Sequence, residues 1–238
     1  MKKLGIIQSR GIGDIIIALP IAKWYSERGV QVYWPIDESF FPSFSSVVDY
    51  VSFIPFKFTH TMDGFLTAPN RMLNEHGCDP IIPLYSFLSG ANLPRRDLFG
   101  SLKFDEYKYA ISGVPFCEKW NLSLKRNFER EDALFQKIIK TEKYVVEHLT
   151  GSNCRFDNPF KFDPSVQIVK ITPETENIFD WIKILENAES LVMVDSCFSN
   201  LVEQLGITKQ KVFILRSDVR FTPVLLSNWK IMGFDKSI

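Results

Sequence analysis

The hydrophobic positions of the first half of the chain form short apolar runs separated by longer amphipathic segments. Runs rich in β-branched and aromatic residues predict strands, and apolar residues spaced three or four apart predict helices. The predicted strands are 4–7, 30–34, 51–54 and a short one near 81–82, and the predicted helices are 14–28 and 44–51. From 55 to 94 the pattern weakens, which predicts long loops.

The second half of the chain repeats this alternation. A strongly amphipathic helix is predicted at 129–141, strands at 143–148, 166–169, 191–194 and 212–215, and shorter helices at 177–187 and 196–205. Strands that alternate with helices predict an α/β protein with parallel sheets. We expect two compact Rossmann-like lobes, residues 1–125 and 126–238.

In such lobes ligands bind at the turns that follow the carboxyl ends of the strands. Three turns are candidates for a binding site, and they are residues 8–14, 149–155 and 195–200.

Composition narrows the function classes. Lysine plus arginine total 28 and aspartate plus glutamate total 28, so the net charge gives no long-range attraction for nucleic acid. The four cysteines lie far apart and lack the paired spacing of a metal site or a disulfide scaffold, which predicts reduced thiols and a cytoplasmic protein. No apolar stretch is long enough to span a membrane.

The first turn reads Gly-Ile-Gly-Asp at residues 11–14. A dinucleotide fingerprint needs glycine at the position of Ile16, and the glycine-lysine loop of nucleoside-triphosphate hydrolases is absent from the sequence. Both a nicotinamide cofactor and that class of hydrolase are disfavoured. The glycines allow a ligand to approach the backbone, and Asp14 is a helix N-cap, a general base or both, with the N-cap favoured by the residues alone.

The turn at 149–155 combines small hydrogen-bonding residues with an arginine. Backbone amides at Gly151, the hydroxyl of Ser152 and the guanidinium of Arg155 suit a phosphate, although an ordinary polar loop has the same composition. His148, which ends the preceding strand, is interpreted as structural, because a lone histidine there is more often so.

The turn at 195–200 lies between a very apolar strand and a helix. Asp195 and Ser196 are suited to cap that helix. Alternatively, if the turn faces a ligand, the hydroxyls of Ser196 and Ser199 and the amino end of the helix offer donors to a diphosphate.

Two segments resemble glycosyltransferase family 9, the heptosyltransferase-like enzymes of the GT-B architecture. Residues 11–20 (GIGDIIIALP) resemble the family's Gly-Asp stretch, which ends in a proline within a strand-turn-helix. Residues 184–196 (ILENAESLVMVDS) resemble its helix, alanine-containing turn, strand and Asp-Thr pair, and the helix at 201–206 continues the match. On these segments the chain is similar to a short, divergent member of that family.

The resemblance implies transfer of a sugar from a nucleoside-diphosphate donor to an acceptor hydroxyl, with Asp14 as the base. The residues expected on the acceptor side are Ser9, Arg10, Gly11 and Gly13. The residues expected to bind the donor are Gly151, Ser152, Arg155, Asp195, Ser196, Ser199 and Asn200. No Asp-x-Asp motif is present, so neither a metal nor a cofactor is expected beside the nucleotide-sugar substrate.

Two alternatives remain. Cys197 stands where the family has glycine and Asn200 where it usually has histidine, which favours a non-catalytic nucleotide- or sugar-binding protein. A glycosyltransferase that modifies phage DNA is the other, although the neutral net charge counts against duplex binding. The expected partners are therefore a nucleotide sugar and a glycan, lipid-linked or DNA acceptor.

Overall fold

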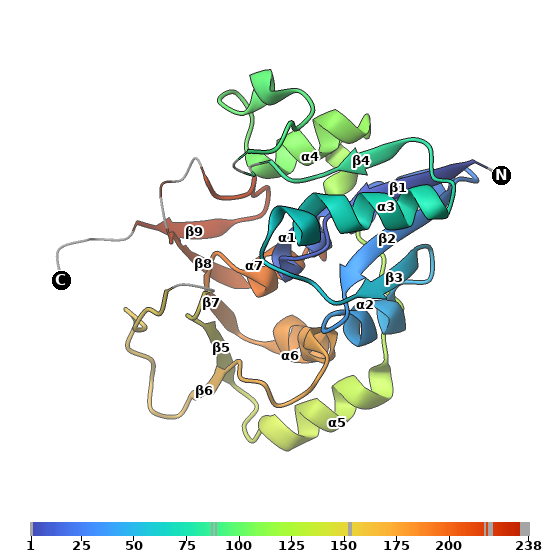
Figure 1. Cartoon of the computed structure of the whole chain (residues 1–238). Coiled ribbons are helices and arrows are strands. Elements are labelled where there is room, and N and C mark those ends of the chain that lie inside the picture. Colours follow the sequence, from blue (N-terminus) through green and yellow to red (C-terminus); the bar gives the residue numbers. More distant parts are fainter. Residues whose placement is uncertain are drawn as a thin grey trace. The chain divides into compact units, whose positions relative to one another are not determined.

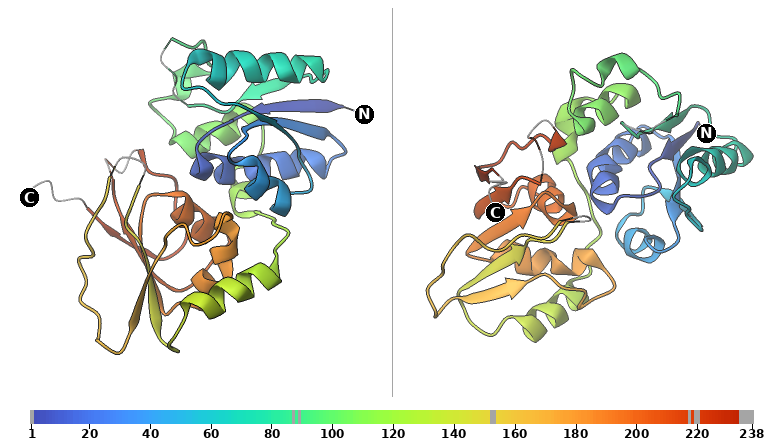
Figure 2. Two further views of the ribbon diagram at one scale, coloured as in Figure 1. Left: turned by 60° about the horizontal axis from the view of Figure 1, so that its bottom comes forward. Right: turned by 60° about the vertical axis from the view of Figure 1, so that its left-hand side comes forward.

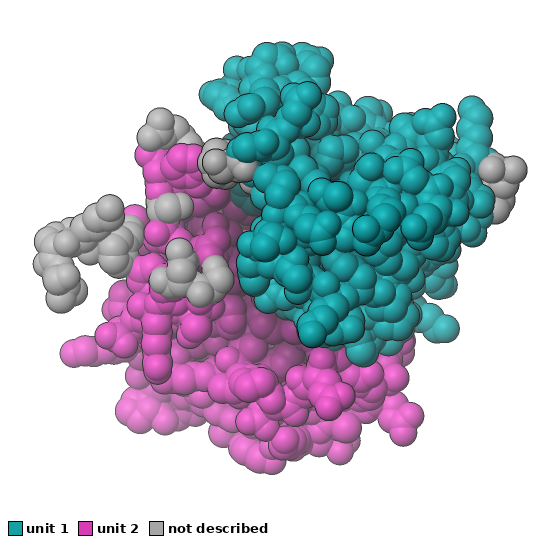
Figure 3. Space-filling view, viewed as in Figure 1, with its two compact units in different colours: residues 1–125 teal, residues 126–238 magenta. Residues whose placement is uncertain are grey.

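The structure is a computed structural model that describes residues 2–86, 88, 90–151, 154–216, 218 and 221–233. The chain divides into two compact units, Met1–Lys125 and Arg126–Ile238 (Figure 3). Each unit has a parallel sheet and helices packed on it, which confirms the predicted α/β fold class (Figure 1). No helix in the described part of the chain is long and apolar enough to cross a membrane.

Four parallel strands form the sheet of the first unit, in the order β3-β2-β1-β4. They are β1 (Lys3–Ile7), β2 (Gln31–Asp37), β3 (Ser52–Phe56) and β4 (Ile81–Pro83), and all four agree with the predicted strands to within a few residues. The chain moves outward from β1 to β3 and then places β4 on the other side of β1. The strand order therefore reverses between β1 and β4, the position at which open parallel sheets bind ligands.

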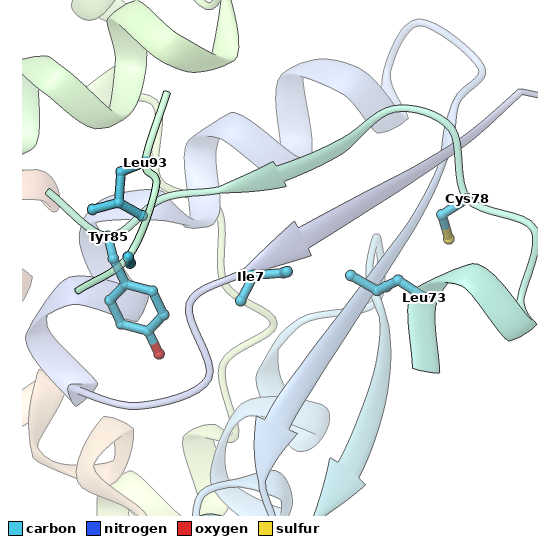
Figure 4. Packing of buried hydrophobic residues seen from close by; sticks show 6 residues of the cluster. Ile7, Leu73, Cys78, Tyr85 and Leu93 are labelled. Carbon is cyan, nitrogen blue, oxygen red and sulfur yellow. The ribbon is translucent and has the colours of Figure 1, made fainter. Parts of the chain in front are cut away.

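Helices α1 (Ile12–Ser26) and α3 (Ala68–Glu75) lie on opposite faces of this sheet (Figure 2). Gly5 in β1 allows α3 to pack closely, because a Cβ at this position would lie 2.8 Å from Cδ1 of Leu73. Leu73 and Ile7 belong to a buried cluster that also contains Tyr85 (Figure 4). The cluster thereby fixes Tyr85 just beyond the carboxyl end of β4.

The prediction of long loops from 55 to 94 is wrong at 63–75, where a π-helical turn (Asp63–Thr67) runs directly into α3. Beyond that segment, α4 (Phe104–Ser112) follows β4 where the sequence pattern assigns no helix. The buried residues of α4 explain why it was missed: they are Asp105, Tyr107, Lys108, Tyr109 and Ser112, and none of them is aliphatic. The short α2 (Phe41–Val47) begins three residues before its predicted start.

Five parallel strands form the sheet of the second unit, in the order β6-β5-β7-β8-β9. They are β5 (Tyr144–His148), β6 (Gln167–Lys170), β7 (Ser190–Val194), β8 (Gln210–Ile214) and β9 (Trp229–Met232). The first four match predicted strands, and β9 was not predicted. Here the strand order reverses between β5 and β7.

The two faces of the second sheet are covered differently. Helices α5 (Phe128–Ile138), α6 (Ile182–Asn187) and α7 (Cys197–Gln204) lie on one face, and the irregular segment 156–166 crosses the other (Figure 2). Phe156, Phe160 and Phe162 of that segment pack against a buried cluster that includes Val145 and Val192. Aromatic side chains thus cover an apolar sheet face in place of a helix.

Candidate functional site

A pocket of about 330 Å³ opens in the first unit beside the reversal of strand order. Residues that follow β1, residues that follow β4 and one residue each from the π-helical turn and α4 form its walls. The lining residues are Gln8, Arg10, Gly11, Asp14, Phe65, Tyr85, Ser86 and Lys108. Three of the residues predicted for the acceptor site, Arg10, Gly11 and Asp14, are therefore brought together.

The start of α1 sets the position of Asp14. Gly11 is the N-cap of the helix, so the prediction that Asp14 caps it is wrong. Gly11 has a φ of 85°, and a Cβ there would lie 2.8 Å from Oδ2 of Asp14, so both the backbone and the space require glycine. Asp14 lies in the first turn, and its carboxylate is at the pocket with 41% of the side chain exposed.

Lys108 of α4 also lines the pocket and contacts Asp14. The distance from its Nζ to Oδ1 of Asp14 is 3.1 Å, and the lysine side chain is only 1% exposed. The same Nζ donates to Oε1 of Gln8 at 2.7 Å and to the carbonyl of Leu84 at 2.9 Å. The sequence pattern gave no sign of Lys108, because it indicates no helix at 104–112.

Arg10 forms another wall of the pocket. Its Nη1 donates to Oδ2 of Asp37, and its guanidinium lies 5.2 Å and 5.3 Å from the ring centroids of Phe40 and Phe58. Burial acts to raise the pKa of Asp37, but hydrogen bonds from Ser39 and the contact with Arg10 outweigh it and hold this pKa below its ordinary value. The ion pair and the two rings fix the direction of the guanidinium.

The other two residues predicted for the acceptor side are near the pocket but do not line it. Ser9 is fully buried, and its backbone N–H donates to the hydroxyl of Tyr85 at 3.0 Å. Burial raises the pKa of Tyr85, so this hydroxyl stays protonated. Gly13 lies in the first turn of α1.

In the second unit a polar cluster lies beside the reversal between β5 and β7. Nδ1 of His148, the last residue of β5, is 2.9 Å from Oγ of Ser196, which follows β7 by two residues. The imidazole packs on Phe198 with 4.8 Å between ring centroids. Burial lowers the pKa of His148 to about 4, so the ring is neutral at neutral pH.

Ser196 is the N-cap of α7, which confirms the capping prediction for this residue but not for Asp195. Its backbone N–H donates to Oγ of Ser199 at 2.9 Å, and that hydroxyl donates to the carbonyl of Ser196 at 2.9 Å. Ser199 is fully buried, and Asn200 is 5% exposed. The hydroxyl of Ser199 is thus used inside the helix start and would have to leave the cap to bind a ligand.

Arg216, the second residue after β8, connects the candidate turns of the second unit. Its Nη2 lies 3.4 Å from Oδ2 of the buried Asp195. Its Cδ would lie 2.9 Å from a Cβ at Gly151, so the turn after β5 also packs against this side chain. Arg216 was not predicted as a site residue, although a basic residue directly after an apolar strand of a parallel sheet was the available signal.

The turn after β5 is a tight loop. Thr150 and Arg155 form an antiparallel bridge, and the N–H of Gly151 donates to the carbonyl of Cys154 at 2.8 Å. Arg155 is exposed, and Ser152 lies outside the described residues. Within the described part of the chain, no three His, Cys, Asp or Glu side chains are arranged to hold a metal ion.

No protein-family model matches the sequence, and no curated protein matches it. The structure is nevertheless similar to solved structures of sugar transferases. A glycosyltransferase family 9 protein from Veillonella parvula has a TM-score of 0.65 and 10% identity, with 100% of this chain and 88% of that chain covered. ADP-heptose LPS heptosyltransferase II of E. coli has a TM-score of 0.59 and 14% identity, with 100% and 92% covered.

E. coli heptosyltransferase WaaC, solved with ADP, has a TM-score of 0.55 and 12% identity, with 97% of this chain and 93% of that chain covered. The chain has the fold of glycosyltransferase family 9. The resemblance indicated by the two short segments of the sequence is therefore confirmed at the level of the fold.

Proposed function

We propose that this chain is a glycosyltransferase that moves a sugar from a nucleoside-diphosphate donor to an acceptor hydroxyl. The observation that carries the proposal is the exposed carboxylate of Asp14, which lines a pocket at the strand-order reversal of a fold shared with glycosyltransferase family 9. A base at this position needs access to a substrate hydroxyl, and an exposed carboxylate in a pocket has that access.

The acceptor would bind in the pocket of the first unit. A hydroxyl next to Asp14 would give its proton to the carboxylate as the hydroxyl oxygen forms a bond to the anomeric carbon of the sugar. The bond from that carbon to the diphosphate breaks at the same time, and the electron pair leaves with the nucleoside diphosphate. The pocket wall at Phe65 and Tyr85 offers aromatic surface for the acceptor.

The donor would bind at the cluster of the second unit. The amino end of α7 carries partial positive charge, and Ser196 at its N-cap contributes a hydroxyl that also accepts from the N–H of Ser199. Arg216, which Asp195 holds beside Gly151, supplies a full positive charge. These groups support binding of a diphosphate and stabilisation of its charge as it leaves, so the reaction as proposed requires no metal.

A panel of nucleotide sugars tests this function. WaaC was solved with ADP, so ADP-glucose is tested first, followed by UDP-glucose and GDP-mannose. We expect one nucleotide to raise the melting temperature, and the matching sugar nucleotide to release its nucleoside diphosphate when a mixture of simple glycosides is added.

The panel also separates the alternatives. Binding of a nucleotide with no release of diphosphate across the acceptors would favour the non-catalytic binding protein. Release that depends on DNA with hydroxylated bases, tested at low salt, would favour the DNA-modifying transferase. The absence of both binding and release across the panel would contradict the proposal.

A further inference from the structure

The first unit contains two buried lysines paired with carboxylates, and the two pairs differ in how exposed the carboxylate is. Lys119 and Asp105 lie 2.6 Å apart, with side chains that are 1% and 0% exposed. Lys108 is also 1% exposed, but its partner Asp14 is 41% exposed. The first pair is closed to solvent, whereas the second presents its carboxylate to a pocket.

The ammonium of Lys108 has three protons and three acceptors. The acceptors come from three segments: Oε1 of Gln8 after β1, the carbonyl of Leu84 after β4, and Oδ1 of Asp14 in α1. A buried ammonium is stable only when its donors are satisfied, so this arrangement holds Lys108 in one place. Lys108 in turn ties Oδ1 of Asp14 to the ends of the two strands that flank the pocket.

The second oxygen of the carboxylate has a different environment. Oδ2 of Asp14 lies beside the Cα of Gly11, where a Cβ would come within 2.8 Å of it. Gly11 lines the pocket together with Asp14 and leaves open the space that any other side chain would take from Oδ2. The two oxygens are therefore unequal, since Oδ1 is held by a buried cation and Oδ2 is bordered by the bare backbone of a glycine.

We infer that Lys108 is a positioning residue that fixes Oδ1 of Asp14 and leaves Oδ2 as the atom that takes the proton of the acceptor hydroxyl. This rests on the proposed role of Asp14 as the base. The proton moves from the hydroxyl to Oδ2, the hydroxyl oxygen bonds to the anomeric carbon, and the nucleoside diphosphate leaves with the electrons of the broken bond. Lys108 keeps its own protons throughout and acts only through the direction of the carboxylate.

Crystal structures of the wild type, Lys108→Met and Lys119→Met test the inference without any substrate. Methionine has a similar length and no charge, and Lys119→Met removes an equally buried lysine that does not line the pocket. In Lys108→Met we expect the carboxylate of Asp14 to rotate or to occupy more than one position, and in Lys119→Met we expect it to stay. An unmoved Asp14 in Lys108→Met overturns the inference. If Lys108→Met does not fold, Lys108→Gln takes its place.

Kinetics with the nucleotide sugar found active among ADP-glucose, UDP-glucose and GDP-mannose separate this inference from the function itself. We expect Lys108→Met to lower kcat about 100-fold, the effect of a reacting group displaced by about 1 Å, with KM for the donor unchanged. Full kcat in Lys108→Met together with an inactive Asp14→Asn overturns the positioning role alone. Full kcat in Asp14→Asn overturns both the base and its positioning.

Discussion

Nδ1 of His148 lies 2.9 Å from Oγ of Ser196, and this contact joins the end of β5 to the amino end of α7. Burial lowers the pKa of His148 from 6.5 to about 4. In the unfolded chain the ring takes up a proton below pH 6.5, whereas the folded chain takes it up only near pH 4. The unfolded state therefore binds more protons in this window, and the free energy of unfolding falls as the pH drops from about 6.5 to about 4.

His148→Gln keeps a polar partner for Ser196 and removes this titration. In chemical denaturation of the wild type, His148 should lower the free energy of unfolding by about 2–3 kcal/mol between pH 7 and pH 4. The free energy of unfolding of the variant should lack this decrease. His60→Gln, which changes an exposed histidine, is the control and should retain the full pH dependence. An unchanged pH dependence in His148→Gln would show that the ring is not held neutral.

Ser196 and Ser199 have different roles, although both are hydroxyls at the start of α7. Ser199→Ala removes the cap contacts with the backbone of Ser196, so we expect the free energy of unfolding to fall by about 1 kcal/mol with ADP affinity nearly unchanged. Ser196→Ala removes the N-cap hydroxyl, so it should also lower the free energy of unfolding by about 1 kcal/mol, and it should in addition weaken ADP binding. Denaturation and calorimetric titration with ADP measure the two effects, and an affinity loss confined to Ser199→Ala would reverse the assignment.

Arg216 is the strongest candidate for binding the donor diphosphate. Arg216→Gln keeps much of the side-chain volume and removes the charge, so we expect ADP to bind about 10- to 100-fold more weakly, as for the loss of a hydrogen bond between charged groups. Arg71→Gln, in an exposed position of the first unit, should bind as the wild type does. Titration of Arg155→Gln with ADP tests the prediction that this exposed arginine binds the donor.

Equal ADP affinity of Arg216→Gln and the wild type would show that Arg216 only pairs with Asp195. That result would mean that the donor diphosphate does not bind at the turn after β8.

Position 11 requires glycine for two reasons, its backbone conformation and the closeness of the Asp14 carboxylate. Gly11→Ala places a methyl group at a φ of 85° and within 2.8 Å of Oδ2 of Asp14. We expect the free energy of unfolding to fall by about 1–2 kcal/mol from backbone strain and transfer to be lost as Asp14 is displaced. Gly29→Ala, at a φ of 75° with open space around its Cβ, is a matched control. Its free energy of unfolding should fall through the same backbone strain, but sugar transfer should be retained.

Much of the fold was predictable because most strands and several helices bury aliphatic residues. Every strand except β9 agrees with an apolar run, and the helix predicted at 129–141 agrees with α5. Strand β9, Trp-Lys-Ile-Met, is only four residues long, too short for a strand pattern to stand out. Helix α3 has three buried residues, Ala68, Pro69 and Leu73, which is too sparse for a helical period to be read.

The candidate sites were predictable only in part, for a related reason. The turns at Gly11 and Ser196 follow clear strands, so their place at the carboxyl edges of the sheets could be predicted. Lys108 could not, because α4 buries the charged residues Asp105 and Lys108, which sequence patterns assign to the surface. The contact of Asp195 with Arg216 joins residues 21 apart and depends on the pairing of β7 with β8.

The central claim is that the carboxylate of Asp14 removes the proton of the acceptor hydroxyl. Its most direct test is the rate of transfer by Asp14→Asn, a substitution of nearly equal size that cannot accept the proton, with Asp63→Asn at an exposed site of the same unit as the control. We predict that kcat falls about 100- to 10,000-fold in Asp14→Asn, with donor affinity near that of the wild type. Transfer at the wild-type rate by folded Asp14→Asn would contradict the claim.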